Sequence, residues 1–92
     1  MKTVFQLADA LSAAETRYIA LGLAAASLTV LVDDAANVEA SVSNAAAPGA
    51  SSLWSALAMT DNSGCTTGPV TGVKLVANAS GGSFSILAMH DR

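Results

Sequence analysis

Covalent and ionic means of stabilisation are scarce in this sequence. Its 92 residues include a single cysteine, Cys65, so no disulfide can form within the chain. Charged residues make up 12% of the chain, against about 25% in ordinary soluble domains. A domain of this size buries only about 60–65% of the surface that its unfolded chain exposes. Since no cluster of His, Cys and carboxylates suggests a structural metal either, we expect association with other subunits to complete its stability.

Aromatic residues are also few, at 4%, although apolar residues reach 52%. Most apolar side chains are therefore Ala, Val and Leu, which suit closely approaching backbones and flat contacts better than one bulky core. A surface poor in Lys and Glu is typical of a subunit that its neighbours cover. The alternative is a monomer kept soluble by Ser, Thr, Asn and Gly. We favour a homo-oligomer.

Basic residues are the scarcest charges, and the net charge is −3. The four of them, Lys2, Arg17, Lys74 and Arg92, form no run and have no aromatic companions. Binding to nucleic acid requires a basic patch that neutralises phosphates. We therefore expect no nucleic-acid partner.

Two segments resemble targeting or membrane signals only in part. Residues 1–14, MKTVFQLADALSAA, begin with a lysine and end in small residues, but Asp9 and Glu15 interrupt the apolar stretch that a signal peptide needs. Residues 18–32 carry no charge, yet this run of about 15 residues is shorter than the ~20 of a membrane helix. It also divides into two alternating runs. We expect strands there, no signal peptide and no membrane association.

The clearest local pattern is GVKLVANASGGSFSIL, residues 72–87. Residues 70–77 and 83–88 alternate between apolar and polar, and Gly81 and Gly82 between them allow the positive φ of a tight turn. The pattern predicts a β-hairpin. Its inward side chains are Val73, Leu75 and Ala77 on the first strand and Phe84, Ile86 and Ala88 on the second.

The rest of the chain contains short alternating runs between turn residues. Strands are expected at residues 37–44 and 53–59, in a run with Ile19, Leu21 and Leu23 on one face, and in a run with Leu28, Val30 and Val32 that ends at an Asp33–Asp34 turn. Residues 45–52, with Pro48 and Gly49, and residues 60–69 are expected as loops. Turn signals recur every 8–12 residues or so, which predicts about seven short strands and an all-β fold, a small β-sandwich or jelly-roll-like domain.

The amino-terminal segment, residues 1–14, fits more than one structure. Val4, Leu7, Leu11 and Ala14 have helical spacing, and LADALSAAE has a high helix propensity. The stretch TVFQLA fits a first strand instead. We favour a strand or an extended arm over a short helix, because the rest is β and a sheet must cover its edges. Residues 1–92 are expected to form one domain.

Candidates for catalysis are few. A Ser–His–Asp or Cys–His arrangement must use His90, the only histidine, but its neighbour Asp91 points to the opposite face of a strand and cannot orient it. Cys65 lies in the polar stretch NSGCTTG, where nothing nearby in the sequence activates a thiol nucleophile. We predict a surface histidine, an incidental thiol, no catalytic residue and no enzyme activity.

Carboxylates give only a weak metal signal. Asp33, Asp34, Glu39 and Asp61 could supply oxygen ligands for calcium, but VDDAANVE lacks the D-x-[DN]-x-[DN]-G pattern. A turn in which an aspartate binds its own backbone fits better. We predict no metal and no cofactor within the chain, and leave open a calcium ion at an interface.

Ligand platforms are similarly sparse. Trp54 could stack on a sugar, but Tyr18, Phe5 and Phe84 are the only other aromatic residues, so a core or interface tryptophan fits better. Gly81 precedes a predicted strand and not a helix, which excludes a phosphate-binding loop.

Residues 37–88 resemble a family of virion proteins. A strand with Trp54, a polar loop, PVTGVKLVAN and a glycine hairpin into a last strand are similar to small β-sandwich proteins of tailed phages. These include capsid cement (decoration) proteins, head-fibre pieces and tail accessory domains. The resemblance implies a non-catalytic sandwich or jelly-roll module, often trimeric, on the capsid or tail. It carries over no binding residue by position.

The function expected from these features is structural. The chain would be a bacteriophage capsid cement subunit on the virion surface, a homotrimer that bridges major capsid proteins by burying apolar area. The expected contact elements are residues 1–14 and the loops at 45–52 and 60–68. The alternative is a tail or fibre module that binds host-surface glycans through an exposed Trp54 or Tyr18. A pilus or surface-layer subunit would need an export signal.

Overall fold

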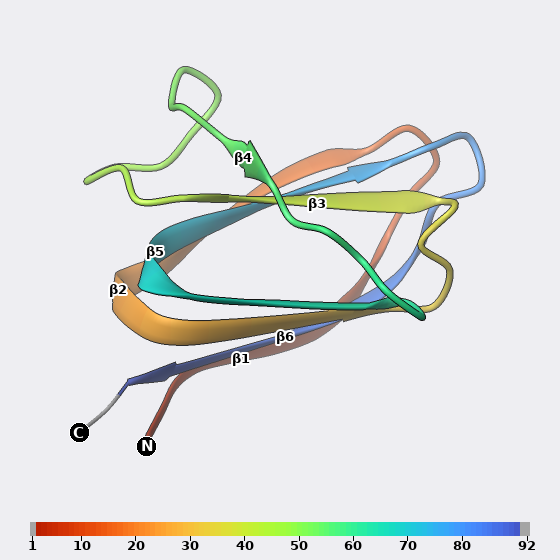
Figure 1. The fold of residues 1–92 in the computed structure, drawn as a ribbon. Helices are drawn as coiled ribbons and strands as arrows, with labels where there is room; N and C mark the ends of the chain where they lie inside the picture. The colour runs from red at the N-terminus through yellow and green to blue at the C-terminus, as the bar shows by residue number, and fades with distance from the viewer. Residues whose placement is uncertain (1, 91–92) are drawn as a thin grey trace.

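The computed structural model describes residues 2–90, which form six strands in one antiparallel sheet (Figure 1). The strands are β1 (Lys2–Leu11), β2 (Thr16–Val32), β3 (Val38–Ser43), β4 (Ser55–Ala56), β5 (Ser63–Ala77) and β6 (Gly82–His90). Their order in the sheet is β1-β6-β2-β5-β3-β4. The described chain holds no helix with the length and apolar character that a bilayer crossing requires. The all-β class predicted from the sequence is confirmed, and the fold is consistent with a small β-sandwich.

The sheet folds into two layers because its two longest strands bend. β2, with 17 residues, pairs with β5, with 15, and their register is interrupted between Ala20 and Ala25 and again before Ser27. After the bend, residues 27–32 of β2 pair with β6. The part of β5 that follows its own bend, residues 72–77, pairs with β3. One layer is therefore β1-β6-β2-β5 and the other β2-β5-β3-β4. Strands that pass from one layer to the other through bulges are a known way to turn the corner of a sandwich.

The bend requires glycine at one position. A Cβ atom on Gly68 would overlap the carbonyl oxygen of Ala25 on the paired strand. Because β2 and β5 cross so closely there, any other residue would force the two backbones apart. The local sequence GP, at Gly68 and Pro69, thus lies inside a strand and not in the loop predicted from it.

The core lies between the two layers. Its fully buried larger side chains are Leu28 and Val30 from β2, Val73 and Leu75 from β5, Val38 from β3 and Ile86 from β6. These are alternate residues of their strands, as the period-2 pattern predicts. The apolar positions expected to face inward on these strands are confirmed except for Leu23, which was expected on one face with Ile19 and Leu21 and is 51% exposed where the β2–β5 register is interrupted.

The predicted β-hairpin is wrong. β5 and β6 are not neighbours, because β2 lies between them in the sheet order. The turn itself exists: Gly81 has φ 68°, and its N–H donates to the Asn78 carbonyl oxygen at 3.2 Å. The chain, however, uses this turn to cross from one layer to the other. Both arrangements place Leu75 and Ile86 in the core, so alternation alone does not distinguish them.

Several predicted boundaries also differ. The two runs expected within residues 18–32 are one bent strand, β2, and most of the expected loop at 60–69 belongs to β5. The strand expected at 53–59 shrinks to Ser55–Ala56. Two long strands therefore replace several of the expected short ones. The strand at 37–44 and the loop at 45–52 are confirmed.

The amino-terminal segment is an edge strand. β1 pairs with β6 of the same chain along most of its length, with an irregularity between Thr3 and Phe5. The helical alternative is wrong, because Phe5, Leu7 and Leu11 all turn toward the core when the segment is extended. The strand interpretation is confirmed, and Lys2–Leu11 does not extend away from the domain as an arm.

Truncating the core should cost far more stability than the same truncation outside it. Leu75 is 0% exposed and Leu53 is 91% exposed. We expect Leu75→Ala to lower the free energy of unfolding by about 2–5 kcal/mol and Leu53→Ala to change it by less than about 0.5 kcal/mol. Urea titration followed by circular dichroism measures both. Equal losses for the two variants would contradict the layer arrangement.

Candidate functional site

The residues singled out for catalysis do not come together. His90 is the last residue of β6, opposite Lys2, and has the inward parity of Ala88. Cys65 is exposed and lies opposite Thr29 in β2, on the outward side. Asp91 lies outside the described residues. Within residues 2–90, no group of His, Cys, Asp and Glu side chains has an arrangement that could hold a metal ion.

The aspartate turn after β2 is confirmed. The Asp34 carboxylate accepts the N–H of Ala36 at 2.9 Å, and its carbonyl oxygen accepts the N–H of Asn37 at 3.0 Å. Asn62, which the sequence reasoning missed, ties this turn to β5: its Oδ1 accepts the N–H of Ala35 at 2.8 Å. Asp34 therefore serves its own backbone, as that interpretation predicted.

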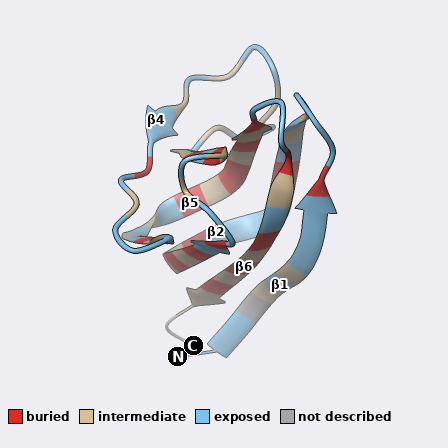
Figure 2. Cartoon of the chain, turned by 90° about the vertical axis from the view of Figure 1, so that its right-hand side faces the viewer, coloured by how far each residue is buried: buried red, intermediate tan, exposed pale blue. Residues whose placement is uncertain are grey.

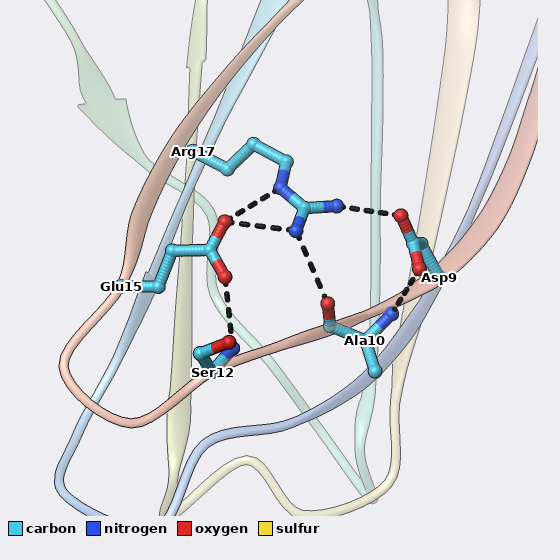
Figure 3. Close-up of polar contacts among 5 residues, drawn as sticks. All are labelled: Asp9, Ala10, Ser12, Glu15 and Arg17. Carbon is cyan, nitrogen blue, oxygen red and sulfur yellow. Dashed lines mark hydrogen bonds and ion pairs between the residues drawn. The ribbon is translucent and has the colours of Figure 1, made fainter.

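The densest polar cluster surrounds Arg17 (Figure 3). Its Nη1 lies 2.8 Å from Asp9 Oδ2, and its Nη2 lies 2.8 Å from Glu15 Oε2. Nη2 also donates to the Ala10 carbonyl oxygen at 3.2 Å. The guanidinium lies 5.6 Å from the centroid of the Phe84 ring. Arg17 thus joins β1, the turn after it and the core at one end of the sandwich.

The electrostatics of this cluster are those of a structural ion-pair network. The Ala10 N–H and then Arg17 lower the pKa of Asp9. The Ser12 N–H and then Arg17 lower the pKa of Glu15, and the two carboxylates raise the pKa of Arg17. Both acids therefore stay ionised at neutral pH and cannot donate a proton to a substrate. The cluster closes the end of the fold.

Acid should weaken this closure. The pKa values of Asp9 and Glu15 in the folded protein lie below their ordinary range, so their contribution to stability is fully present above about pH 5 and is lost as the pH falls through the lower folded values. We expect the melting temperature to fall below about pH 5. Arg17→Met removes one cause of the lowered pKa values of Asp9 and Glu15. The melting temperature of this variant should therefore fall less steeply with decreasing pH than that of the wild type.

Lys74→Met is the matched control, since it removes a cation without touching Asp9 or Glu15, and it should keep the wild-type pH profile. Thermal unfolding between pH 2 and pH 7, or roughly that range, measures all three proteins. An Arg17→Met protein with the wild-type profile would show that the cluster does not cause the acid dependence.

Along its described strands, the outward side of the β1-β6-β2-β5 layer carries no charged residue; one charged residue, Asp33, borders it just beyond the end of β2, beside Leu31 and Ser83. Its members alternate with the core residues and follow from the strand registers: Thr3, Gln6, Ala8 and Ala10 on β1; Ser83, Ser85, Leu87 and Met89 on β6; Ser27, Thr29 and Leu31 on β2; Ser63, Cys65 and Thr67 on β5. We name this set the charge-free face. Leu31, near its centre, is 49% exposed.

The outward side of the other layer is different. Tyr18, Lys74 and Ser41 form one cross-strand row there, next to Glu39 on β3. Trp54 packs over this row, with its ring centroid 5.8 Å from that of Tyr18 and 5.6 Å from Lys74 Nζ. This layer therefore carries charge and is partly covered.

Trp54 holds the loop at 45–52 against the sheet. Its indole N–H donates to the carbonyl oxygen of Gly49 at 3.0 Å. Pro48 of the same loop sits over Gly72, where a Cβ would lie 2.5 Å from Pro48 Cβ. Trp54 is thus outside the core, so the core alternative is wrong, while the interface alternative stays a prediction.

The charge-free face is suited to contact with another protein surface. Burying a charged side chain requires a paired partner, whereas Ser, Thr, Ala and Leu can be covered at little electrostatic cost. The sequence reasoning placed the contacts in residues 1–14 and in the loops at 45–52 and 60–68; the first and last of these segments supply the β1 and β5 members of this face, whereas its β2 and β6 members were missed. A signal was available: the polar positions of the alternating strands are Ser and Thr where Lys and Glu are usual.

Comparison with known protein families, with curated proteins and with solved structures finds no match. The function therefore has to be argued from the surfaces of the chain.

Proposed function

We propose that this chain is a structural, non-catalytic subunit of a tailed-phage virion, a capsid decoration (cement) protein that bridges major capsid proteins. The charge-free face is the observation that carries the proposal. It lies on a layer of four strands and presents uncharged side chains at the outward positions, most of them small and the larger ones mainly apolar. Such a surface fits a flat protein neighbour better than a small-molecule ligand.

Burial supplies the binding energy in this role. Apolar area removed from water contributes about 25 cal/mol per Å², and a standard protein contact covers about 800 Å² on each partner. Bridging two or more capsid proteins with one subunit adds avidity, because the second contact becomes intramolecular. Many copies around a capsid would then resist the outward pressure of a packaged genome.

The two outward sides suggest an orientation. The charge-free face would lie on the capsid, and the layer with Lys74 and Glu39 would face the solvent. Hydration of these charges is preserved in that orientation and lost in the reverse one. The contacts would thus come mainly from strands, with β1 among them, and the loop at 45–52 would stay on the far side.

The resemblance to small phage β-sandwich proteins gives secondary support. The all-β fold agrees with it, whereas the glycine hairpin that formed part of the pattern is a crossing between layers. The support is therefore the architecture and the strand-and-turn pattern of residues 37–88, and not the hairpin.

A charge on the charge-free face should prevent attachment. Thr29 and Thr16 both lie on β2 and point outward, Thr29 on the charge-free face and Thr16 on the other layer. We expect Thr29→Lys to lose binding to particles assembled without the chain, because its ammonium would be buried. Thr16→Lys should bind like the wild type. Cosedimentation measures binding, and heat-induced genome release measures stabilisation of the particle.

Three results would overturn this role. One is that particles of a phage whose gene for this chain is deleted release their genome at the same temperature with and without added protein. Another is that the purified virion lacks the chain. A third is equal binding by Thr29→Lys and the wild type, which would place the contact elsewhere.

A second candidate function is glycan binding by a tail or fibre module. The observation in its favour is Tyr18, a residue that is 42% exposed and lies beside Trp54 and Lys74. The ring of Tyr18 is the one available to stack on a sugar. Lys74 lies over the ring of Trp54, and the indole N–H of Trp54 already donates to the Gly49 carbonyl oxygen.

Because Trp54 is the only tryptophan, its fluorescence reports on this site directly. For glycan binding we expect a saturable change in emission with glucose, galactose or N-acetylglucosamine oligosaccharides, and its loss in Tyr18→Ala. The control Tyr18→Phe keeps the ring and should keep most of the change. An emission spectrum unaffected by all three sugars would exclude this candidate for them.

A further inference from the structure

The two edges of the sheet are unequal. β4, at one edge, has two residues, whereas β1, at the other, has ten. Figure 2 shows β1 at one side of the molecule, exposed along most of its length. A long edge strand leaves backbone groups available to another chain, and short edge strands are one way to prevent this. The β1 edge is therefore the one to examine for pairing.

The register with β6 determines which β1 groups point outward. The carbonyl oxygen of Ser83 accepts the N–H of Asp33 at 3.1 Å, so the backbone groups of Ser83 point toward β2. Ser83 is opposite Ala10. In an antiparallel pair, two opposite residues either exchange both backbone hydrogen bonds with each other or both direct their N–H and C=O groups away from each other. Ala10 must therefore direct its N–H and C=O to the open edge.

The cluster around Arg17 agrees with this direction. The Ala10 N–H donates to Asp9 Oδ1 at 2.8 Å, and the Ala10 carbonyl oxygen accepts from Arg17 Nη2 at 3.2 Å. Side chains of the same molecule thus occupy the open edge at Ala10. This end of β1 is closed to another strand.

Farther along β1 the edge is not occupied. The register with β6 is unbroken from Phe5 to Leu11, so Ala8 and Gln6 direct their backbone groups the same way as Ala10. Both residues are exposed, and no hydrogen bond found among residues 2–90 engages their backbone groups on this side. Gln6 and Ala8 therefore present two N–H and C=O pairs to solvent.

We infer that the open edge of β1 pairs antiparallel with β1 of a second copy of this chain, about a two-fold axis at Leu7. Gln6 of one copy exchanges both backbone hydrogen bonds with Ala8 of the second copy, and Ala8 with Gln6. This register uses the unoccupied groups of Gln6 and Ala8 in full, and it leaves Ala10 with the side chains that already bind it. The two sheets become one.

A second copy fits this edge because the edge is self-complementary. An antiparallel strand pairs with itself about a two-fold axis, which gives an isologous and closed contact. The half-buried Leu7 side chains would meet across the axis and extend the core, and Asp9 is already neutralised by Arg17. No like charges face one another.

The pairing also extends the charge-free face. Gln6 and Ala8 belong to that face, so the joined sheets present it as one surface across both copies. The contact makes a dimer, whereas the resemblance to phage virion proteins implies a trimer. The inference concerns the purified protein and holds whether or not the chain belongs to a virion.

Proline at Ala8 tests the contact. Ala8→Pro removes an edge N–H that β6 does not use, so the monomer should keep its circular dichroism spectrum. Two intermolecular hydrogen bonds are lost per dimer, which should raise the dimer dissociation constant at least about tenfold. Ala8→Val keeps the N–H and should dimerise like the wild type. Sedimentation equilibrium measures all three proteins.

Cross-linking tests the register. In a Cys65→Ser background, Leu7→Cys places two thiols on the axis as a non-hydrogen-bonded pair, close enough for a disulfide. Phe5→Cys is the control, because its two copies would lie about 13 Å apart along the strands. We expect oxidised glutathione to give covalent dimers of the first variant and not of the second.

A monomeric wild type, a trimer, or equal cross-linking of both variants would overturn the inference. None of these results decides attachment to particles, which the Thr29→Lys comparison measures separately. An Ala8→Pro monomer that still binds particles would leave the proposed function in place.

Discussion

The continuous pairing of β2 with β5 is the interaction on which the rest of the structure depends. These strands pair on both sides of their bend, and each belongs to both layers. The register interruption near Ala25 and the close approach at Gly68 turn the sheet through the corner. A chain without disulfides obtains a two-layer core in this way, because each half of the ladder brings apolar positions of β2 and β5 to the same interior.

The bend also separates the two outer surfaces. One layer carries the charge-free face, and the other carries Lys74, Glu39 and the loop held by Trp54. The other charges of residues 2–90 lie at turns and near the ends of strands, as the pairs around Arg17 illustrate. The few charged residues of this chain thus lie away from one side of the sheet, which is left uncharged. That asymmetry links the fold to the proposed role in assembly.

Alternation predicted which side chains are buried, but not which strands are partners. Leu75 and Ile86 were assigned to the core correctly, while the hairpin that contained them was wrong. A turn at Gly81 allows the chain to reverse within a sheet or to cross between layers, and both satisfy the same apolar pattern. The choice depends on β2, which supplies hydrogen bonds to β5 and β6 alike. Partners so distant in sequence leave no local signal.

The sequence by itself determined the all-β class, the inward positions, the turn at Asp34 and the scarcity of charge. Each depends on residue type and local spacing, which govern burial and turn chemistry. Only the tertiary structure decided the bend, the outward position of Trp54 and the side of the sheet that lacks charge. It also left Gln6 and Ala8 at an open edge. These features arise from backbone pairing between strands far apart in the sequence. Nearly every residue type can make the same backbone hydrogen bonds, so the residue types alone do not specify which strands pair.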